Sequence, residues 1–222
     1  MYIYNIYVKY MNCLSTIGKM QKGPRIWPEL AWYKFNNDTL DYSENNVGKF
    51  AGSSRGALYS TYLTRKVYLF DGGAWSTGNY ISLPALTRSS TMTFSCFINV
   101  ANVIQYMRIF DFGDSFRLYL VNATSVKFNE VYTMQFQSTM LNAWKHIAFT
   151  VNGTQLIVYE NGLAVGTISM TASVLSDTSF GFIGHSPFSN DPNLAGQMYD
   201  FRIYNRALGS NEIFALFQDN SV

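Results

Sequence analysis

Carboxylate side chains that could act as a catalytic pair are scattered along this 222-residue chain. A retaining glycosidase needs two carboxyl groups about 5 Å apart, which one strand supplies from alternate positions because every second side chain shares a face. The glutamates show no such spacing; they are Glu29, Glu44, Glu130, Glu160 and Glu212. Asp111 and Asp114 come closest, but Gly113 indicates a turn with solvated acids. The sequence therefore predicts no hydrolytic pair and no enzyme.

Histidine and cysteine offer no recognisable catalytic or metal-binding motif. The two histidines, His146 and His185, belong to neither an H-E-x-x-H motif nor a Cys/His cluster. We interpret His146 as a neutral structural residue, whereas His185 precedes a polar loop and is suited either to touching a ligand or to being solvated. Cys13 and Cys96 are expected to stay reduced, and Cys96 lies in an alternating apolar run that indicates a core position.

Aromatic side chains are the best candidates for contact with a ligand, because flat rings stack on the faces of sugars. Trp75 lies in the turn-rich segment G-G-A-W-S-T-G-N, where a large apolar ring needs a partner to cover it. Tyr80, His185 and Phe188 lie on predicted strands or loops that such a ligand could reach. The alternative is core or edge packing, which accounts for most of a 17% aromatic content.

Short extended segments bounded by turn residues must position these side chains. Two Asn-Gly steps, Asn152-Gly153 and Asn161-Gly162, predict tight hairpins and hence a three-stranded meander that begins at Trp144. The remaining predicted strands are Leu30-Phe35, Val67-Asp71, Tyr80-Leu83, Met92-Val100, Ile104-Phe112, Phe116-Val121, Val131-Phe136, Phe180-Gly184 and Gln197-Tyr204. Their spacing is typical of an all-β sandwich or barrel. A short C-terminal helix is predicted to follow, capped by Ser210 and with Glu212 in its first turn.

Composition and charge narrow the classes of partner. A net charge of +2 with 14% charged residues provides no basic field for nucleic acid. No apolar run reaches the roughly 18 residues of a membrane span, and the first twenty residues lack both a basic leader and a clean apolar stretch, so no export signal is predicted. The localisation stays open between a virion and a cell-surface assembly.

The chain divides into an arm, residues 1–28, and a domain, residues 29–222. Gly-Pro and Trp-Pro steps mark the boundary, because they disfavour regular structure. In the arm, Tyr2, Tyr4, Ile6 and Val8 alternate with a second set of side chains. That pattern suits a strand added to the sheet edge of a protein partner or of a second copy. The alternative is that the arm folds back on its own domain.

Several sequence blocks, taken in order, carry a family resemblance. From Trp144 the chain reads W-K-H-I-A-F-T-V-N-G, then L-I-V-Y-E-N-G, F-G-F-I-G and G-Q-M-Y-D-F-R-I-Y-N-R-A-L. Upstream it reads A-W-Y-K-F-N-N-D-T-L-D-Y-S, L-F-D-G-G, Y-I-S-L-P and M-T-F-S-C-F-I-N-V. Together these blocks resemble the concanavalin A-like, laminin-G-type jelly-roll family from about Leu30 to the C-terminus. The resemblance implies two antiparallel sheets packed face to face.

The resemblance also implies what such a domain could bind. Many laminin-G-like domains hold one calcium ion, and Asp71 and Asp200 match two acidic positions of the family. The alternative is that Asp71 only forms the turn with Gly72 and Gly73, while Asp200 pairs with Arg202. Members of the family bind glycans or proteins, and relatives of the broader fold are glycoside hydrolases.

Two functional hypotheses follow from the residues and the resemblance together. The first is a non-catalytic structural or recognition subunit of a larger assembly, such as a minor capsid or attachment protein of a virion. The second is an autonomous lectin-like domain that binds glycans. They differ in where function lies: in the arm for the first hypothesis and in the loops for the second.

Overall fold

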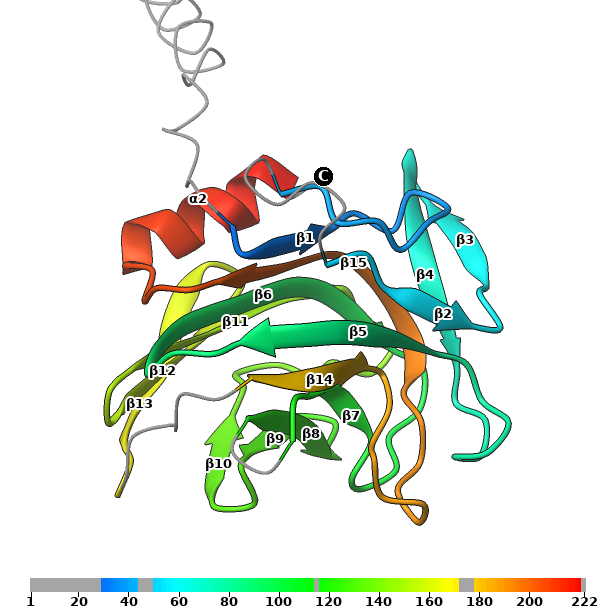
Figure 1. The fold of residues 1–222 in the computed structure, drawn as a ribbon. Helices are drawn as coiled ribbons and strands as arrows, with labels where there is room; N and C mark the ends of the chain where they lie inside the picture. The colour runs from blue at the N-terminus through cyan, green and yellow to red at the C-terminus, as the bar shows by residue number, and fades with distance from the viewer. Residues whose placement is uncertain (1–28, 44–49, 114–115, 172–177, 221–222) are drawn as a thin grey trace, which may run out of the picture.

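The computed structural model describes residues 29–43, 50–113, 116–171 and 178–220 (Figure 1). Alternating apolar and polar residues between turns form most of its β-strands. The strands are β1 (Ala31–Tyr33), β2 (Ser53–Arg55), β3 (Tyr59–Tyr62), β4 (Arg65–Asp71), β5 (Tyr80–Thr87), β6 (Thr91–Val100), β7 (Arg108–Asp111), β8 (Arg117–Asn122), β9 (Ser125–Phe128), β10 (Tyr132–Gln135), β11 (Lys145–Asn152), β12 (Gln155–Glu160), β13 (Leu163–Ser169), β14 (Thr178–Ile183) and β15 (Ala195–Tyr204). Helix α2 (Ser210–Asn220) follows them.

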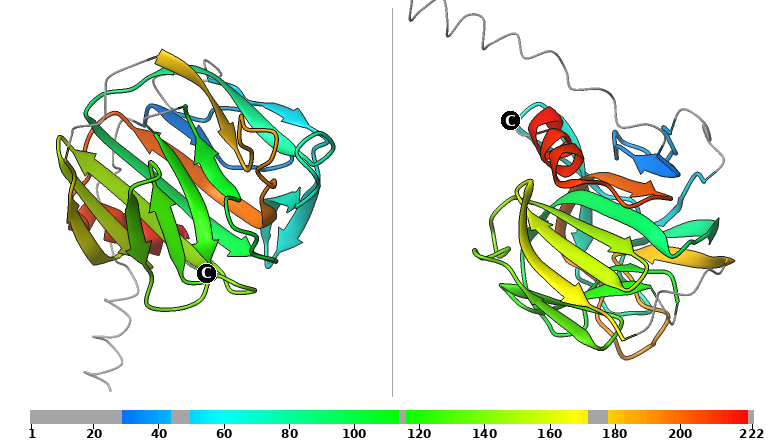
Figure 2. Two further views of the ribbon diagram at one scale, coloured as in Figure 1. Left: turned by 90° about the horizontal axis from the view of Figure 1, so that it is seen from below. Right: turned by 90° about the vertical axis from the view of Figure 1, so that its left-hand side faces the viewer.

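The strands form two antiparallel sheets that face each other (Figures 1 and 2). One sheet has the order β13-β12-β11-β6-β15-β4-β3, with β1 also paired to β15, and the other has the order β10-β9-β8-β7-β14-β5-β2. Helix α2 lies over the outer face of the eight-stranded sheet, and β1 is the eighth strand of that sheet through its pairing with β15 (Figure 1). The predicted all-β, two-sheet jelly roll with a short C-terminal helix is therefore confirmed.

The core lies between the sheets, and β11 shows how its two faces are used. Ile147, Phe149 and Val151 point into the inter-sheet core. On the opposite face, Ala148 belongs to a second apolar cluster with Ile213 and other residues of α2. Both faces are buried, which explains why both sets of alternating residues in this strand are largely apolar.

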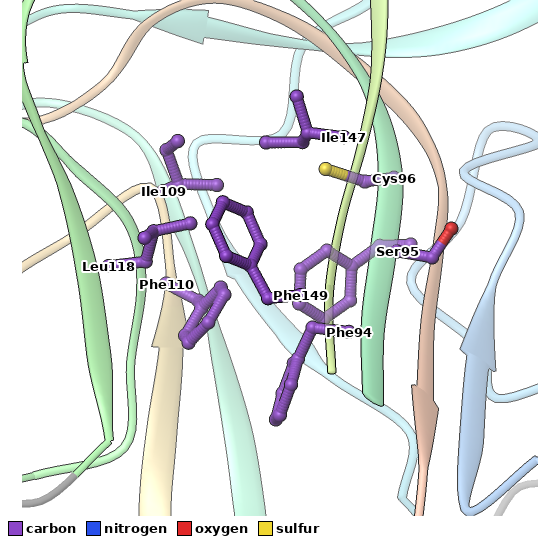
Figure 3. Close-up of a pocket in the computed structure, with 9 residues that line it drawn as sticks. Phe94, Ser95, Cys96, Ile109, Phe110, Leu118, Ile147 and Phe149 are labelled. Carbon is purple, nitrogen blue, oxygen red and sulfur yellow. The ribbon is translucent and has the colours of Figure 1, made fainter. Parts of the chain in front are cut away.

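Among the described residues, side chains fill the space between the two sheets. Figure 3 shows the rings of Phe94, Phe110 and Phe149 there, and the space that they enclose has no room for a water molecule. The thiol of Cys96 lies in the same core, fully buried and free, and burial raises its pKa far above the ordinary value. The predicted core role of Cys96 is confirmed, and Cys13 lies outside the described residues.

The two predicted Asn-Gly turns differ from each other. In the second hairpin Asn161 and Gly162 are the central residues, and both have positive φ, as the mirror-image type I′ turn requires. In the first hairpin Asn152 pairs with Gln155, so the central residues are Gly153 and Thr154. Because only Gly153 has positive φ, this turn matches type II′, and the prediction that Asn152 forms the turn is wrong by one residue.

Other element boundaries also shift. The short polar strands β2 and β3 and the strand β9 were not predicted, and only Arg108–Asp111 of the predicted strand Ile104-Phe112 is extended. Helix α2 begins at Ser210, while the N–H of the preceding Gly209 donates to the carboxylate of Glu212 at 2.9 Å. Gly209 therefore occupies the capping position that the sequence had indicated for Ser210. Within the described ranges, no helix is long and apolar enough to cross a membrane.

Candidate functional site

The loop of residues 72–79, between β4 and β5, is closed at its base by two side chains. The Asp71 carboxylate accepts hydrogen bonds from the N–H of Gly73 at 2.9 Å and the N–H of Asn79 at 3.1 Å. The Asn79 side chain accepts from the N–H of Asp71 at 2.8 Å and donates to the carbonyl of Leu69 at 2.6 Å. These bonds fix the loop that carries Trp75.

A second loop, residues 184–194 between β14 and β15, lies beside the first. His185 and Asn193 close its base with a 2.6 Å contact between Nδ1 and the side-chain oxygen. The amide of Asn193 also donates to the carbonyl of Ala74 at 3.1 Å, which ties the two loops together. Within the second loop, the Ser186 hydroxyl donates to Asp191 at 2.7 Å. Both loops are thus held by side-chain bonds to each other and to the strand ends.

Three of the four predicted ligand-binding side chains meet where these loops touch. The rings of Tyr80 and His185 are stacked with centroids 4.0 Å apart, and the Trp75 ring lies 5.5 Å from His185. The Trp75 indole N–H donates to the carbonyl of Ser186 at 2.7 Å. Phe182 of β14 packs edge-on against both Tyr80 and His185. We call Trp75, Tyr80, Phe182 and His185 the aromatic cluster.

His185 is neutral at physiological pH in this cluster. Burial lowers the pKa of its imidazole, the contact with Asn193 opposes that effect, and the positive charge of Arg55 adds to it. A neutral ring stacks on Tyr80 without bringing a charge to the site. His185 therefore supports the neighbouring rings of Trp75 and Tyr80. The indole of Trp75 is half-buried, so part of its surface is open to solvent.

Phe188, the fourth predicted residue, lies outside the aromatic cluster. Its N–H donates to the hydroxyl of Ser186 at 3.1 Å, and its side chain is 47% exposed. The guanidinium of Arg117 lies 5.3 Å from the centre of its ring. Phe188 therefore belongs to the rim of the loop rather than to the stack.

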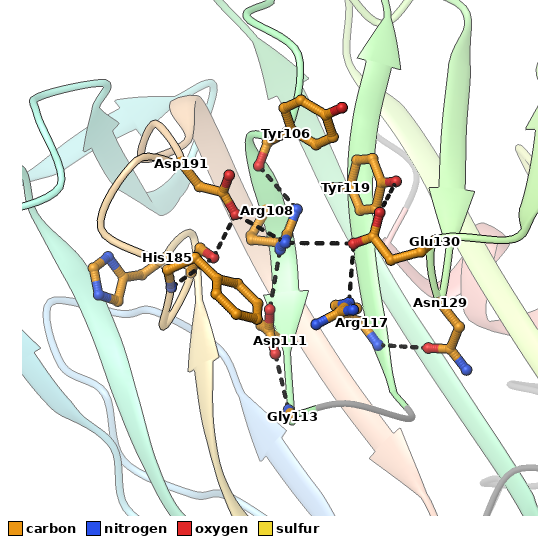
Figure 4. Close-up of polar contacts among 12 residues, drawn as sticks. Tyr106, Arg108, Asp111, Gly113, Arg117, Tyr119, Asn129, Glu130, His185 and Asp191 are labelled. Carbon is orange, nitrogen blue, oxygen red and sulfur yellow. Dashed lines mark hydrogen bonds and ion pairs between the residues drawn. The ribbon is translucent and has the colours of Figure 1, made fainter.

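A buried arginine, which the sequence analysis missed, fastens the second loop to the seven-stranded sheet (Figure 4). Arg108 of β7 is 2% exposed and pairs with Asp111 at 3.0 Å and with Asp191 of the loop at 2.9 Å. Its guanidinium also lies 4.6 Å from the ring centre of Tyr119. Glu130 stands 3.7 Å away and bonds to the Tyr119 hydroxyl at 2.6 Å. The sequence signal was the pair Arg108 and Asp111 in a short strand that is otherwise apolar. Asp111 is fully buried, so the prediction that it is a solvated turn acid is wrong.

The two aspartates predicted for calcium do not share a site. Asp71 pairs with Ala195, the first residue of β15, and Asp200 lies five positions further on, roughly 16 Å along an extended strand. Asp200 accepts from the Trp32 indole at 2.6 Å and from Arg202 at 3.0 Å. No group of three or more His, Cys, Asp or Glu side chains suited to a metal ion occurs among the described residues.

The described glutamates are all engaged with cationic side chains. The pairs are Glu29 with Arg202, Glu130 with Arg117, Glu160 with Lys145 and Glu212 with Arg206. Glu44 and Asp114 lie outside the described residues, and so do the arm residues Tyr2, Tyr4, Ile6 and Val8. The aromatic cluster itself contains no carboxylate.

Solved structures with the same architecture include one domain of an arabinanase and domains of toxins. Domain 4 of an extracellular arabinanase from Geobacillus stearothermophilus, solved with arabinotriose, has a TM-score of 0.71 at 21% identity, covering 86% of this chain and 98% of that domain. The ganglioside-interacting chain of botulinum neurotoxin type C has a TM-score of 0.65 at 16% identity, and the binding domain of Paraclostridial Mosquitocidal Protein 1 has 0.65 at 17%. The match covers 86% of this chain in both cases but only 51% and 52% of those two chains.

Sequence comparison gives the family. No curated protein sequence matches the chain significantly. Residues 72–214, however, match the profile of the Concanavalin A-like lectin/glucanases superfamily, and this range contains both loops and the whole aromatic cluster. The chain belongs to the concanavalin A-like lectin/glucanase superfamily, as a laminin-G-like jelly-roll domain.

Proposed function

We propose that this protein is a non-catalytic carbohydrate-binding domain and that Trp75 is its stacking platform. The observation that carries the proposal is the arrangement of Trp75: an indole fixed by its bond to Ser186, backed by His185 and partly open to solvent. Rigid aromatic rings give contact area at low cost in conformational entropy. The arabinotriose complex of the domain from the arabinanase supports the same class of ligand for this fold.

A binding role also agrees with the chemistry around the cluster. His185 is neutral and hydrogen-bonded, and the glutamates of the described ranges are paired with cations. A glycosidase would need one carboxylic acid and one carboxylate facing a common substrate. The residues of the aromatic cluster provide neither, so we assign them to recognition.

The test is the loss of glycan binding when the platform is removed. A glycan array that includes arabinotriose would first identify ligands, and calorimetry would then compare variants. We expect Trp75→Ala to weaken binding at least about tenfold, the loss of about 1.4 kcal/mol typical of a central aromatic contact. Trp75→Phe should fall in between, because it keeps a ring but loses the bond to Ser186.

A matched control removes an aromatic ring elsewhere. Phe214 is 38% exposed and belongs to helix α2, which covers the outer face of the eight-stranded sheet, so Phe214→Ala should leave glycan affinity unchanged. Equal affinities of the wild type and a folded Trp75→Ala variant would refute the platform.

We infer a second candidate function, a subunit of a larger assembly such as a virion, from an exposed sheet edge. Strand β13 ends the eight-stranded sheet, reads L-A-V-G-T-I-S and has no charged residue or proline. Leu163 at its start is 63% exposed. Natural proteins usually protect such an edge with charge, because its free N–H and C=O groups can pair with another strand. The alternating sequence of the arm fits that role.

Light scattering on the wild type and three variants tests this second function. We expect both deletion of residues 1–28 and Thr167→Lys on β13 to convert an assembly into monomers. Gln155→Lys, which adds the same charge to the interior strand β12, should not. A wild-type protein that is monomeric at high concentration would argue against the assembly role.

A further inference from the structure

Arg55 stands beside the aromatic cluster although it comes from a different part of the chain. It is the last residue of β2 and lies opposite Tyr80 in the register of β2 with β5. Its guanidinium carbon is 5.8 Å from the centre of the Tyr80 ring. One of its nitrogens donates to the carbonyl of Ser76, the residue after Trp75. Arg55 therefore touches both the stack and the loop that carries the platform.

Arg55 has no carboxylate partner among the described residues, whereas several other arginines have one. Among the residues that the structure describes, no carboxylate lies within 4 Å of its guanidinium, whose partners are a carbonyl and an aromatic ring. Each of four other arginines has a carboxylate partner; they are Arg108, Arg117, Arg202 and Arg206. A guanidinium has five N–H donors, and only one hydrogen bond from Arg55 is made within the described chain. Its side chain is exposed, so the remaining donors are accessible.

The ionisable groups at the bases of these loops have partners other than Arg55. His185 is neutral for the reasons given above. Asp71, at the base of the same loop, directs its carboxylate to the N–H groups of Gly73 and Asn79. The site therefore combines a flat aromatic surface with one available cation.

We propose that the Trp75 site binds an acidic sugar, whose ring stacks on the indole while its carboxylate accepts hydrogen bonds from Arg55. This inference rests on the proposed carbohydrate-binding function and specifies the class of ligand. The planar guanidinium matches a carboxylate through two parallel N–H···O bonds, which are stronger than bonds between neutral groups. A neutral sugar would gain the stacking contact alone.

The experiment compares acidic sugars with their neutral methyl esters. Calorimetry would measure trigalacturonic acid against its fully methyl-esterified form, and 3′-sialyllactose against its methyl ester, at low and high salt. We expect at least one acidic probe to bind about tenfold more tightly than its neutral counterpart at low salt, an advantage that salt reduces. Arg55→Gln should abolish this difference, because it weakens binding of the acidic probe more than binding of its neutral counterpart.

Two further variants separate the outcomes. Lys66→Gln removes a positive charge on β4, where Lys66 bonds to Thr61 at 3.0 Å, and should preserve the preference for acid. Trp75→Ala should weaken both members of a pair. If Trp75→Ala weakens binding but acidic and neutral probes bind equally, the acidic-sugar inference fails while the platform stands. If no probe of either kind binds, or if a sulfated trisaccharide is preferred to trigalacturonic acid, the inference also fails.

Discussion

His146 shows what the fold does to a single titratable residue. Its Nε2 lies 2.8 Å from the hydroxyl of Ser95, and its Nδ1 is buried without a partner. The ring is covered by Phe97 and by Phe217 of α2, with centroids 4.9 and 5.8 Å away. Burial, with a smaller contribution from the charge of Arg202, lowers its pKa to about 3. The predicted structural role of this histidine agrees with these contacts.

The low pKa of His146 makes the fold sensitive to acid. In the unfolded chain its pKa is close to 6.5, so as pH falls the unfolded state takes up the proton first. The free energy of unfolding contributed by neutral His146 is present above about pH 6.5 and is lost as pH falls towards about 3. We expect His146→Gln to flatten this pH dependence, measured by urea unfolding at pH 7.5 and 4.5.

Comparing how the free energy of unfolding changes with pH in the wild type and in His146→Gln separates the effect of His146 from that of the carboxyl groups. Burial raises the pKa of Glu29 and Asp111, while Glu160 and Glu212 have lowered pKa values. These groups titrate in both proteins and cancel in the difference. An unchanged slope in the variant would mean that His146 does not control acid stability.

At the scale of elements, the two hairpin turns of the meander place similar glycines in different surroundings. Gly153 has φ of +61° and open space where a side chain would stand. Gly162 has φ of +81°, and a methyl group there would lie 2.9 Å from Cδ2 of Phe214 and 3.0 Å from Cβ of Phe217. Helix α2 therefore packs directly against the second turn.

Substituting both glycines separates backbone strain from packing. Gly153→Ala should destabilise the protein by about 1–2 kcal/mol, the strain of an alanine in the left-handed region. Gly162→Ala should cost at least about 1 kcal/mol more, because the helix must move to relieve the overlap. Chemical denaturation of the two variants measures the difference. Equal losses of stability would show that α2 adapts freely to the added methyl group.

For the whole molecule, much of the architecture was predictable because it depends on local patterns. Alternation and turn residues located most strands, and the order of blocks after Trp144 indicated the family. The strands β2 and β3, S-S-R and Y-S-T-Y, were missed because they are short and polar and pair at sheet edges. Their extended form depends on neighbours, which single-sequence patterns do not include.

The candidate site was predictable only in part. Trp75, Tyr80 and His185 could be chosen one by one as aromatic or loop residues, but their contact arises from two loops that are distant in sequence. Arg55 and Arg108 were missed for the same reason, since their roles depend on partners brought in by the sheet. Phe188 was grouped with the others, yet the bonds of Ser186 turn its loop so that it lies at the rim.

The surroundings of Trp75 also mean that ligand binding can be measured by the intrinsic tryptophan fluorescence of the protein. The emission of an indole depends on the polarity of its surroundings, and this indole lies where solvent meets the site, against a histidine. Trp32 and Trp144 lie instead with the eight-stranded sheet, against Asp200 and Tyr199. A ligand that covers Trp75 would therefore change one component of the intrinsic fluorescence, so occupancy could be followed without a dye or tag.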